Sequence, residues 1–273
     1  AATKMALKLS DIAVVEAGFA SDLGGEKFMD IASRYGGFHP QAVVLVTTVR
    51  ALKMHGGVSK TELKGENREA LAKGFGNLDA HLENLAQFGV PVVVAVNRFP
   101  TDTLGELDDV LNHVRGRGHE AALSEVWEKG GDGGMELAEK VLASMKRSNG
   151  YHPLYELGLP LKEKIEKIAT HVYGAEGVDY IDSASAFLDD LEKRGYGALP
   201  VCMAKTQMSL TDDPSKIGRP KGWRLLVREV RLSAGAGFVV PICGTIMTMP
   251  GLPKKPAAES IDIDDQGRIT GLF

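Results

Sequence analysis

Cysteine is scarce in this sequence. Cys202 and Cys243 are the only two cysteines among 273 residues, and each lies within an apolar run. No CxxC pair and no cluster of histidine with cysteine accompanies them. The pattern favours two buried, reduced thiols over a disulfide or a metal site, and reduced thiols are typical of a cytoplasmic protein. We therefore expect a cytoplasmic location and no metal centre held by the chain.

Long hydrophobic runs and a strong excess of either charge are also missing. The longest apolar stretches have the length of buried strands and fall well short of the ~18 to 20 residues that span a membrane. A segment with the charged and then apolar pattern of a secretion signal is not seen either. The net charge of -4 and the pI near 6.0 give no reason to expect binding to nucleic acid or to an anionic membrane. Small molecules are the expected partners.

The phosphate-binding motif GxxxxGK[ST] is absent as well. The glycine-rich stretch SAGAGF at residues 233–238 resembles the start of a dinucleotide-binding fingerprint, but a β-type run follows it where a helix is required. We interpret it as a bulge or a tight turn. The sequence has no initiator methionine and begins at once with helix-like spacing, so we expect that it starts inside a longer protein.

Three apolar, β-branched runs dominate the first hundred residues: IAVVEAGF (12–19), AVVLVTTV (42–49) and PVVVAVNRF (91–99). Because a half-exposed strand would alternate apolar and polar residues, these continuous runs predict parallel strands that are buried on both faces. Between the second and third runs, leucines and a phenylalanine at helical spacing over residues 71–85 predict a crossover helix, closed by Gly89 before Pro91. The connection is expected to be right-handed.

The sequence pattern changes after residue 103, where helical spacing replaces the apolar, strand-like runs. Helices are predicted over residues 104–115, 121–129 and 135–146, and then over 161–172 and 184–193, with strands at 178–181 and 198–204. A β-rich part follows at 223–232 and 237–246, with a hairpin across 265–267. We predict an α/β fold with a boundary near residue 105. Residues 1–105 would form part of a nucleotide-binding parallel-sheet domain, and residues 106–273 a helical segment plus a second α/β domain.

Ligands of open parallel sheets bind beyond the carboxyl ends of the strands, so the strand exits are the candidate site. At the first exit, Glu16 could orient a magnesium-bound water and Phe19 could present a ring, or the two could be a satisfied carboxylate and a core residue. Asp22 and Glu26 are expected to cap the next helix. The second exit carries Arg50, Lys53 and His55 beside two glycines. These residues could bind an anion or simply form a solvated helix surface.

The third exit, VNRFPTDT at residues 96–103, offers two kinds of recognition. The carboxamide of Asn97 could pair with the edge of a purine, and together with Asp102 it resembles the base-recognition corner of P-loop nucleotide binders. Phe99 and Pro100 could form a clamp for a planar ring with Leu123 and Trp127, which are four residues apart on one predicted helix. The alternative for these apolar residues is a small core between two domains.

Seven segments together resemble the formate–tetrahydrofolate ligase family, also called formyltetrahydrofolate synthetase. They are ATKMALKLSDIAVVEAGFASDLGGEKF, TTVRALKMHGG, VNRFPTDT, VWEKGGDGGMELAEKV, CMAKTQMSLTDDP, LSAGAGFVVPICGTIMTMPGLP and ITGLF. The resemblance runs from Ala2 to Phe273 and covers the carboxyl-terminal half of that family. The other half carries the family's P-loop and the residues that hold formyl phosphate, which would explain both the abrupt start and the missing motif. Met208, Ser21 and Gly25 depart conservatively from the pattern.

The resemblance implies an ATP-dependent ligase with a P-loop NTPase-like fold, ATP, Mg²⁺ and tetrahydrofolate as its cofactor and substrates, and possible use of a monovalent cation. Formate would be phosphorylated to formyl phosphate, and N10 of tetrahydrofolate would attack the activated carbonyl. Phe99 and Trp127 resemble the family's stacking pair for the pterin ring, and Phe19, Pro100 and Leu123 line the same cleft.

Other roles follow only from position at a strand exit. Glu16, Arg50, Lys53 and His55 are candidate catalytic residues, and Asn97 and Asp102 are candidate nucleotide-binding residues. The resemblance further implies a homotetramer, partnership with the amino-terminal half, and no turnover by this chain alone. The alternative is a non-catalytic module for folate binding or oligomerisation that lacks the ATP-activating half.

Overall fold

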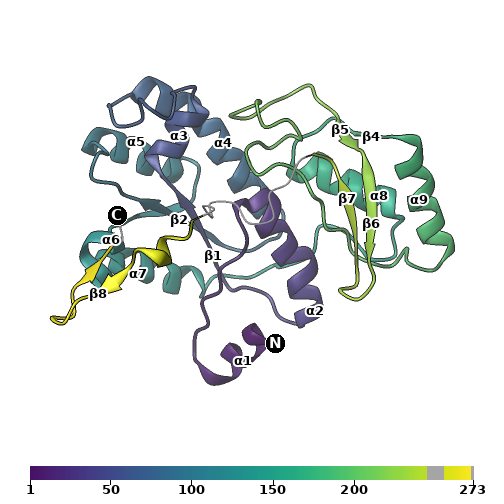
Figure 1. Ribbon diagram of the computed structural model, residues 1–273, viewed down its shortest axis with the longest axis horizontal. Coiled ribbons are helices and arrows are strands. Elements are labelled where there is room, and N and C mark those ends of the chain that lie inside the picture. Colours follow the sequence, from purple (N-terminus) through teal and green to yellow (C-terminus); the bar gives the residue numbers. More distant parts are fainter. Residues whose placement is uncertain (245–254, 272–273) are drawn as a thin grey trace.

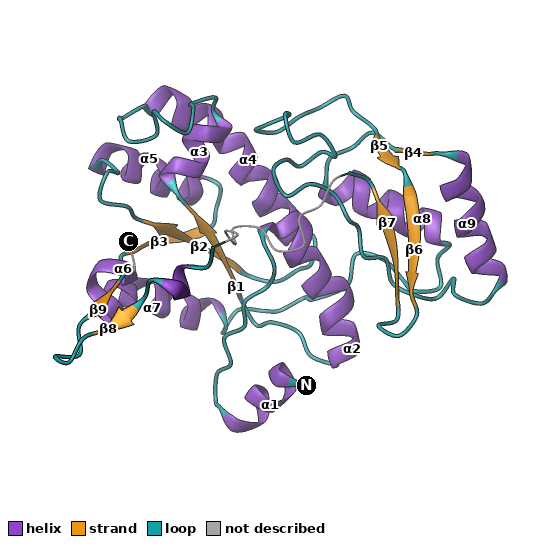
Figure 2. Cartoon of the chain, in the orientation of Figure 1, coloured by secondary structure: helices purple, strands orange, loops and turns teal. Residues whose placement is uncertain are grey.

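The computed structural model describes residues 1–244 and 255–271, which form two adjoining α/β units (Figure 1). The first unit is built on a parallel sheet of three strands, and the second contains two smaller sheets. Helix α4 (Arg68–Ala86) runs between them (Figure 2). The expected α/β class with a small parallel sheet is confirmed.

The larger sheet has the order β1-β2-β3, with β1 at Val43–Thr47, β2 at Val92–Asn97 and β3 at Glu120–Ser124. All three strands are parallel, and Asn97 at the end of β2 is paired with Ser124 at the end of β3. Strand β2 is buried on both faces, as its sequence predicts. Burial on both faces is wrong for β1. It is an edge strand, and its Val44 and Val46 are 41% and 62% exposed because one face is not covered.

Three helices cover the sheet and have polar amino-terminal caps. They are α3 (Val49–His55), α4 and α5 (Leu104–Gly116), capped by the side chains of Thr48, Asn67 and Thr103. Thr103 and Glu106 form a reciprocal capping box. The apolar faces of the helices pack with β2 into one core that extends from Val49 to Ala121. The predicted helices at 71–85 and 104–115 are thereby confirmed.

Two sequence predictions in the first unit are wrong. Residues 12–19 form no strand, and Val14 is 94% exposed, because β-branched composition gives an extended segment but no strand within the described part of the chain pairs with it. The single helix predicted over residues 121–129 is instead β3 followed by the short helix α6 (Val126–Lys129). The free edge of β2 offers backbone hydrogen bonds to residues 120–124, and this pairing overrides their helical spacing.

The remaining elements of the first unit are short helical segments. They are α1 (Ala2–Leu9), the π-helical segments η1 (Ala20–Gly25) and η2 (Phe28–Ser33), α2 (Arg34–Gly36), the 3-10 segment η3 (Gly130–Gly134) and α7 (Met135–Ser144). The last of these confirms the helix predicted at 135–146.

The second unit has its own core around Tyr173, Leu188 and Val239. Its elements are α8 (Leu161–Lys167), its π-helical continuation η4 (Ile168–Val172), β4 (Val178–Tyr180), α9 (Asp182–Lys193), β5 (Leu225–Val227), β6 (Glu229–Ser233) and β7 (Phe238–Ile242). Strands β4 and β5 pair in parallel, and β6 and β7 form a hairpin. The helices and the strand predicted between residues 161 and 193 are confirmed, and SAGAGF is the hairpin turn.

Three outcomes complete the comparison. The strand predicted at 198–204 is reduced to isolated bridges, Val201 with Val239 and Ala204 with Ile242. The hairpin predicted across 265–267 is confirmed as β8 (Asp262–Ile263) and β9 (Ile269–Thr270), which follow the 3-10 segment η5 (Ala257–Glu259). Much of the predicted loop MPGLPKKPAAE, and the end of the strand predicted at 237–246, lie outside the described residues.

Two further points concern the whole chain. Within residues 1–244 and 255–271, none of the helices combines the length and the apolar character that crossing a membrane requires. The domain boundary near residue 105 stays a prediction; beyond it, α5 packs on the sheet of the first unit and β3 is a strand of that sheet.

Candidate functional site

The exits of β2 and β3 lie side by side at the carboxyl edge of the larger sheet. The Arg98 backbone N–H donates to the carbonyl of Ser124 over 3.1 Å, and the Arg98 guanidinium forms an ion pair with Glu125. Glu125 also binds the Lys129 ammonium, at 2.6 Å. The polar pairs therefore hold the loop after β2 against the start of α6. Phe99 leaves β2 and Trp127 leaves β3 at this edge.

The loop from Phe99 to Asp102 is fixed by its own hydrogen bonds. The Asp102 carboxylate accepts the Phe99 N–H at 2.8 Å, and the Asp102 N–H donates to the Phe99 carbonyl at 3.0 Å. Burial raises the pKa of Asp102, although the Phe99 N–H and the charge of Arg50 act in the opposite direction. Its second oxygen, Oδ1, is buried and has no hydrogen-bond partner among residues 1–244 and 255–271.

Arg50 covers one face of the Phe99 ring. Its guanidinium carbon lies 4.1 Å from the ring centroid, and its Nη2 donates to Thr101 Oγ1 at 3.0 Å. The ring itself is half-buried, whereas Trp127 is 69% exposed. Two aromatic side chains thus stand at neighbouring strand exits, one backed by a cation and the other open to solvent. Such a pair can stack against a flat ring.

Lys53 does not have the surroundings expected for an anion-binding residue. Its side chain is fully buried, and its ammonium binds the Glu106 carboxylate at 2.9 Å and the Gly65 carbonyl at 2.8 Å. Burial raises the pKa of Glu106, but hydrogen bonds from the Asn67 backbone, Lys53 and the Thr103 backbone outweigh it, so that the pKa is lowered. The ammonium of Lys53 therefore neutralises a buried carboxylate, and its role as a candidate catalytic residue stays a prediction.

His55 is also engaged within the protein. Its Nδ1 accepts the Gly218 N–H at 3.1 Å, which ties the end of α3 to a loop of the second unit. Burial lowers the pKa of His55, and the nearby His81 lowers it further. The imidazole is therefore neutral at pH 7 and serves as an acceptor. It does not supply the positive charge that the sequence suggested.

Glu16 and Phe19 lie on a different segment of the chain from the Phe99 loop and α6. Both are exposed, Phe19 at 67%, and they belong to the extended segment that the sequence predicted as a strand. Phe19 directly precedes η1, which packs against α4, whereas Trp127 lies in α6 beside η3. In the view of Figure 1 these elements lie on opposite sides of β1. Phe99 and Trp127 thus follow neighbouring strand ends, and the joint cleft of these two rings with Phe19 stays a prediction.

The remaining predicted residues lie close to the Phe99 loop in sequence. Asn97 is the last residue of β2 and is half-buried, and Pro100 is exposed at the tip of the loop. Leu123 lies on β3 and packs against the core, so the predicted helical spacing between Leu123 and Trp127 is wrong. The two rings of the predicted clamp, Phe99 and Trp127, therefore each follow the end of a strand.

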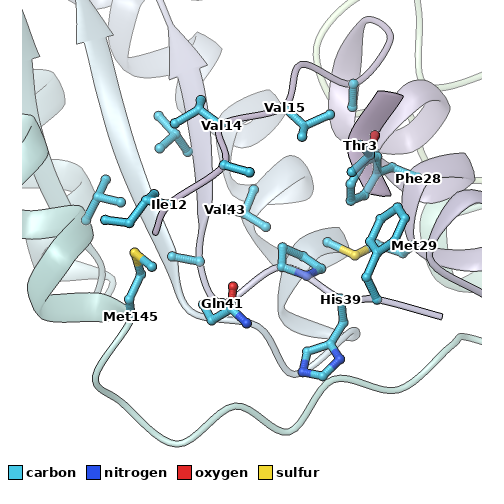
Figure 3. A pocket seen from close by; sticks show the side chains of 18 of the residues that line it. Thr3, Ile12, Val14, Val15, Phe28, Met29, His39, Gln41, Val43 and Met145 are labelled. Atoms are coloured by element: carbon cyan, nitrogen blue, oxygen red, sulfur yellow. The ribbon is translucent and has the colours of Figure 1, made fainter. Parts of the chain in front are cut away.

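A separate pocket of about 260 Å³ lies at the amino end of the sheet (Figure 3). Val14 and Val15 of the extended segment line one side, and Val43 of β1 lies across from them. Thr3, His39 and Gln41 supply polar side-chain atoms, and the other lining residues are mostly apolar. The pocket contains none of the residues predicted to bind folate or nucleotide.

Sequence reasoning missed a buried polar cluster between the two units. Asp22 and Lys205 form an ion pair at 2.7 Å, and the Lys205 ammonium also binds the Ser209 carbonyl and lies 4.8 Å from the centre of the Tyr173 ring. His81 Nδ1 lies 2.7 Å from Ser21 Oγ. Asp22 is thus part of a buried ion pair, and its side chain does not cap η1 as we expected. The one signal in the sequence was a lysine directly following the apolar run VCMA.

Glu26, also expected to cap a helix, is fully buried. Burial raises its pKa well above the ordinary value, and the neighbouring Asp30 raises it further. Asp30 is itself buried, and its Oδ1 accepts the Leu154 N–H at 2.8 Å. The carboxyl groups of Glu26 and Asp30 are thus both buried, and Asp30 contacts the segment around Leu154 that leads into the second unit.

No group of three or more histidine, cysteine, aspartate or glutamate side chains within residues 1–244 and 255–271 has the arrangement of a metal site.

The whole sequence fits a known protein family. Comparison with known protein families matches residues 1–273, the entire chain, to formate–tetrahydrofolate ligase.

Proposed function

Because the chain belongs to the formate–tetrahydrofolate ligase family, we propose that it supplies the folate-binding cleft of an enzyme that joins formate to tetrahydrofolate. The observation that carries this proposal is the pair of rings at neighbouring strand exits, Phe99 backed by Arg50 and Trp127 open to solvent. A pterin ring is flat, and stacking on an aromatic ring contributes about 0.5 to 1.5 kcal/mol beyond burial. Pro100 and Leu123 would border the ring.

The proposed reaction uses ATP to convert formate into formyl phosphate, after which N10 of tetrahydrofolate attacks the formyl carbon and phosphate leaves. The products are 10-formyltetrahydrofolate, ADP and phosphate. Phosphorylation turns a poor acyl donor into a good one, so the protein has to position the reactants and stabilise charge. The cleft would hold the pterin while N10 meets the carbonyl.

The nucleotide-binding roles rest on the same edge. We propose that Asn97 and the unpartnered oxygen of Asp102 meet the nucleotide, since both lie at the end of β2. Mg²⁺ would arrive with the phosphates of ATP, which commonly supply several of its ligands. Glu16 remains a candidate for the reaction only if the extended segment moves, and Lys53 and His55 would act by holding α3.

Several parts of the proposal concern what lies around the chain. The amino-terminal half of the enzyme would contribute the P-loop and the formyl phosphate site, so this chain alone would not turn over. A homotetramer, a cytoplasmic location and assistance from a monovalent cation are proposed from the family resemblance. The second candidate function is a folate-binding or oligomerisation module without catalysis, which the intact stacking pair would equally permit.

The folate cleft can be tested by fluorescence, because Trp127 is exposed and Trp223, the only other tryptophan, is 5% exposed. The Trp223→Phe variant leaves Trp127 as the sole reporter. Tetrahydrofolate should quench its emission in a saturable manner. Phe99→Leu should weaken binding about tenfold, because one stacking face is lost. Tyr35→Leu, which removes an exposed ring elsewhere, is the matched control.

Phe19→Leu decides whether the third ring takes part, since Phe19 belongs to a different segment from Trp127 and is exposed. An unchanged affinity would support a two-ring cleft. Absence of saturable quenching in the chain would contradict the folate proposal. Formate-dependent release of ADP by the chain alone would contradict the proposed need for the amino-terminal half, and would also exclude the non-catalytic alternative.

A further inference from the structure

We propose that Arg50 is a positioning residue that holds the inner face of Phe99, so that only the outer face of the ring is available to a flat ligand. This inference rests on the proposed folate function and deepens it. Arg50 follows β1 and Phe99 follows β2, so the contact of 4.1 Å between guanidinium and ring centroid joins two neighbouring strand exits. It changes the role of Arg50 from a ligand for an anion to a support for the stacking ring.

Arg50 and Phe99 both lie in segments that other contacts fix in place. Thr48 caps α3 by accepting the Ala51 N–H at 3.0 Å, and Val49 and Leu52 bury the helix in the core. Asp102 accepts the Phe99 N–H at 2.8 Å and fixes the loop that carries the ring. The guanidinium is then anchored by its hydrogen bond to Thr101 at 3.0 Å. A ring fixed in this way loses little conformational freedom when a ligand stacks on it.

Arg50 forms no ion pair with a carboxylate among the described residues, and its Nε is buried without a partner. Its guanidinium therefore makes its direct contacts with the ring and the Thr101 hydroxyl, while its charge also acts on the nearby Asp102. A guanidinium suits this task because it is planar and stacks on an aromatic face while donating from its edge, which an ammonium cannot do in the same way. Lysine at position 50 should not replace it.

The test measures binding of tetrahydrofolate to the whole chain by calorimetry. Arg50→Ala and Arg50→Lys should each weaken binding about 3- to 10-fold, the range expected when a cation–π support is removed. Arg68→Ala is the matched control, because Arg68 is an exposed arginine that binds Asp109 through two hydrogen bonds and should leave the affinity unchanged. Thr101→Val should have a smaller effect of the same sign.

A double-mutant cycle separates positioning from direct contact. In the Phe99→Leu background, Arg50→Ala should have no further effect, because its action passes through the ring. The loss should also be the same for a tetrahydropterin that lacks the aminobenzoylglutamate tail. An effect of Arg50→Ala that persists without Phe99, or that appears only with the tailed probe, would overturn the inference, since Arg50 would then touch the ligand itself.

The contact between Arg50 and Phe99 can also be measured without ligand, which separates this inference from the folate-binding proposal. A guanidinium over an aromatic ring has its side-chain N–H proton resonances shifted upfield by the ring current, and Phe99→Leu should remove the shift of the Arg50 signals. Unchanged Arg50 signals in that variant would refute the contact. Failure of the unmodified chain to bind either probe would instead contradict the folate function, and the resonance test would still decide the placement of Arg50.

Discussion

At the scale of single residues, three lysines are buried in the part of the chain that the structure describes, and each ammonium has a defined partner. Lys53 binds Glu106, Lys205 binds Asp22, and Lys164 donates to the carbonyls of Gly197 and Leu199. Burial lowers the pKa of Lys164 to about 8. Because an unpaired buried charge is costly, removing either member of such a pair should lower the free energy of unfolding, since the remaining charge is left buried without its partner.

The pair of Lys53 and Glu106 gives the sharpest prediction at this scale. Lys53→Met should lower the free energy of unfolding by about 3 to 5 kcal/mol, because it leaves the Glu106 carboxylate buried without its cation. Urea unfolding followed by circular dichroism measures the change. Lys73→Met breaks an exposed pair with Glu69 and should cost at most about 0.5 kcal/mol. A loss below 1 kcal/mol for Lys53→Met would contradict the buried-pair account.

Between elements, close approach of backbones decides where α3 and α4 cross. A Cβ atom at Gly74 would lie 1.9 Å from the Leu52 carbonyl oxygen, and one at Gly56 would lie 1.8 Å from the Ala70 carbonyl oxygen. Each glycine therefore faces the other helix at a point where only hydrogen fits. Gly76, also on α4, meets nothing closer than the Arg219 side chain at 3.7 Å.

Two alanine substitutions on α4 should consequently have opposite signs. Gly74→Ala should destabilise the protein by about 1 to 3 kcal/mol, because the helices must separate. Gly76→Ala should stabilise it by up to about 1 kcal/mol, since alanine has the higher helix propensity and ordinary space. Thermal unfolding of the two variants side by side measures both effects. Equal shifts of the same sign would refute the crossing geometry.

On the scale of the whole molecule, polar contacts join the two units. Asn77 of α4 donates to the Gly218 carbonyl at 2.9 Å, and Arg219 pairs with Glu83. The Leu154 N–H donates to the buried Asp30. Burial raises the pKa of Asp30 to about 6, while the hydrogen bond from Leu154 and the charge of Arg34 limit the rise. This junction should therefore respond to pH.

The sign of that response follows from linkage. The folded state holds the Asp30 proton up to about pH 6, whereas the unfolded chain releases it near its ordinary value of 3.8. Stability contributed by this proton is present at low pH and is lost as pH rises from about 4 to 6. Relative to Asp30→Asn, the unmodified chain should lose on the order of 1 to 3 kcal/mol across that window.

Urea unfolding at several pH values measures this difference. Asp109→Asn provides a control of opposite sign, because the hydrogen bond and charge of Arg68 lower the pKa of Asp109. The unmodified chain should gain stability relative to that variant as pH rises. Parallel curves for Asp30→Asn and the unmodified chain would show that Asp30 does not titrate as proposed.

Comparison of sequence and structure shows which signals were sufficient. The run at residues 91–97 predicted β2 because a strand buried on both faces needs no alternation, and the spacing of residues 71–85 predicted α4. The run at 12–19 failed because strand formation needs a partner that composition alone does not supply. Residues 120–124 form β3 although most of them were predicted to be helical, because they pair with the free edge of β2.

In the candidate site, too, features that depend on one strand could be predicted from the sequence, and contacts between distant residues could not. Phe99, Asn97 and Asp102 could be assigned to a strand exit from the sequence, because their strand was predicted correctly. The cation above Phe99 could not be foreseen, since Arg50 lies 49 positions earlier and meets the ring only through the pairing of β1 with β2. Lys53 was misread because nothing in its neighbours showed that Glu106 would be buried beside it.

The sequence by itself determined the family, the α/β class and the identity of the aromatic residues, because these depend on local composition and on motifs that are contiguous in the chain. Only the tertiary structure decided which polar groups neutralise one another and which ring faces remain open. Those outcomes depend on contacts between residues far apart in sequence, where burial sets the cost of an unpaired charge and strand register sets which side chains meet.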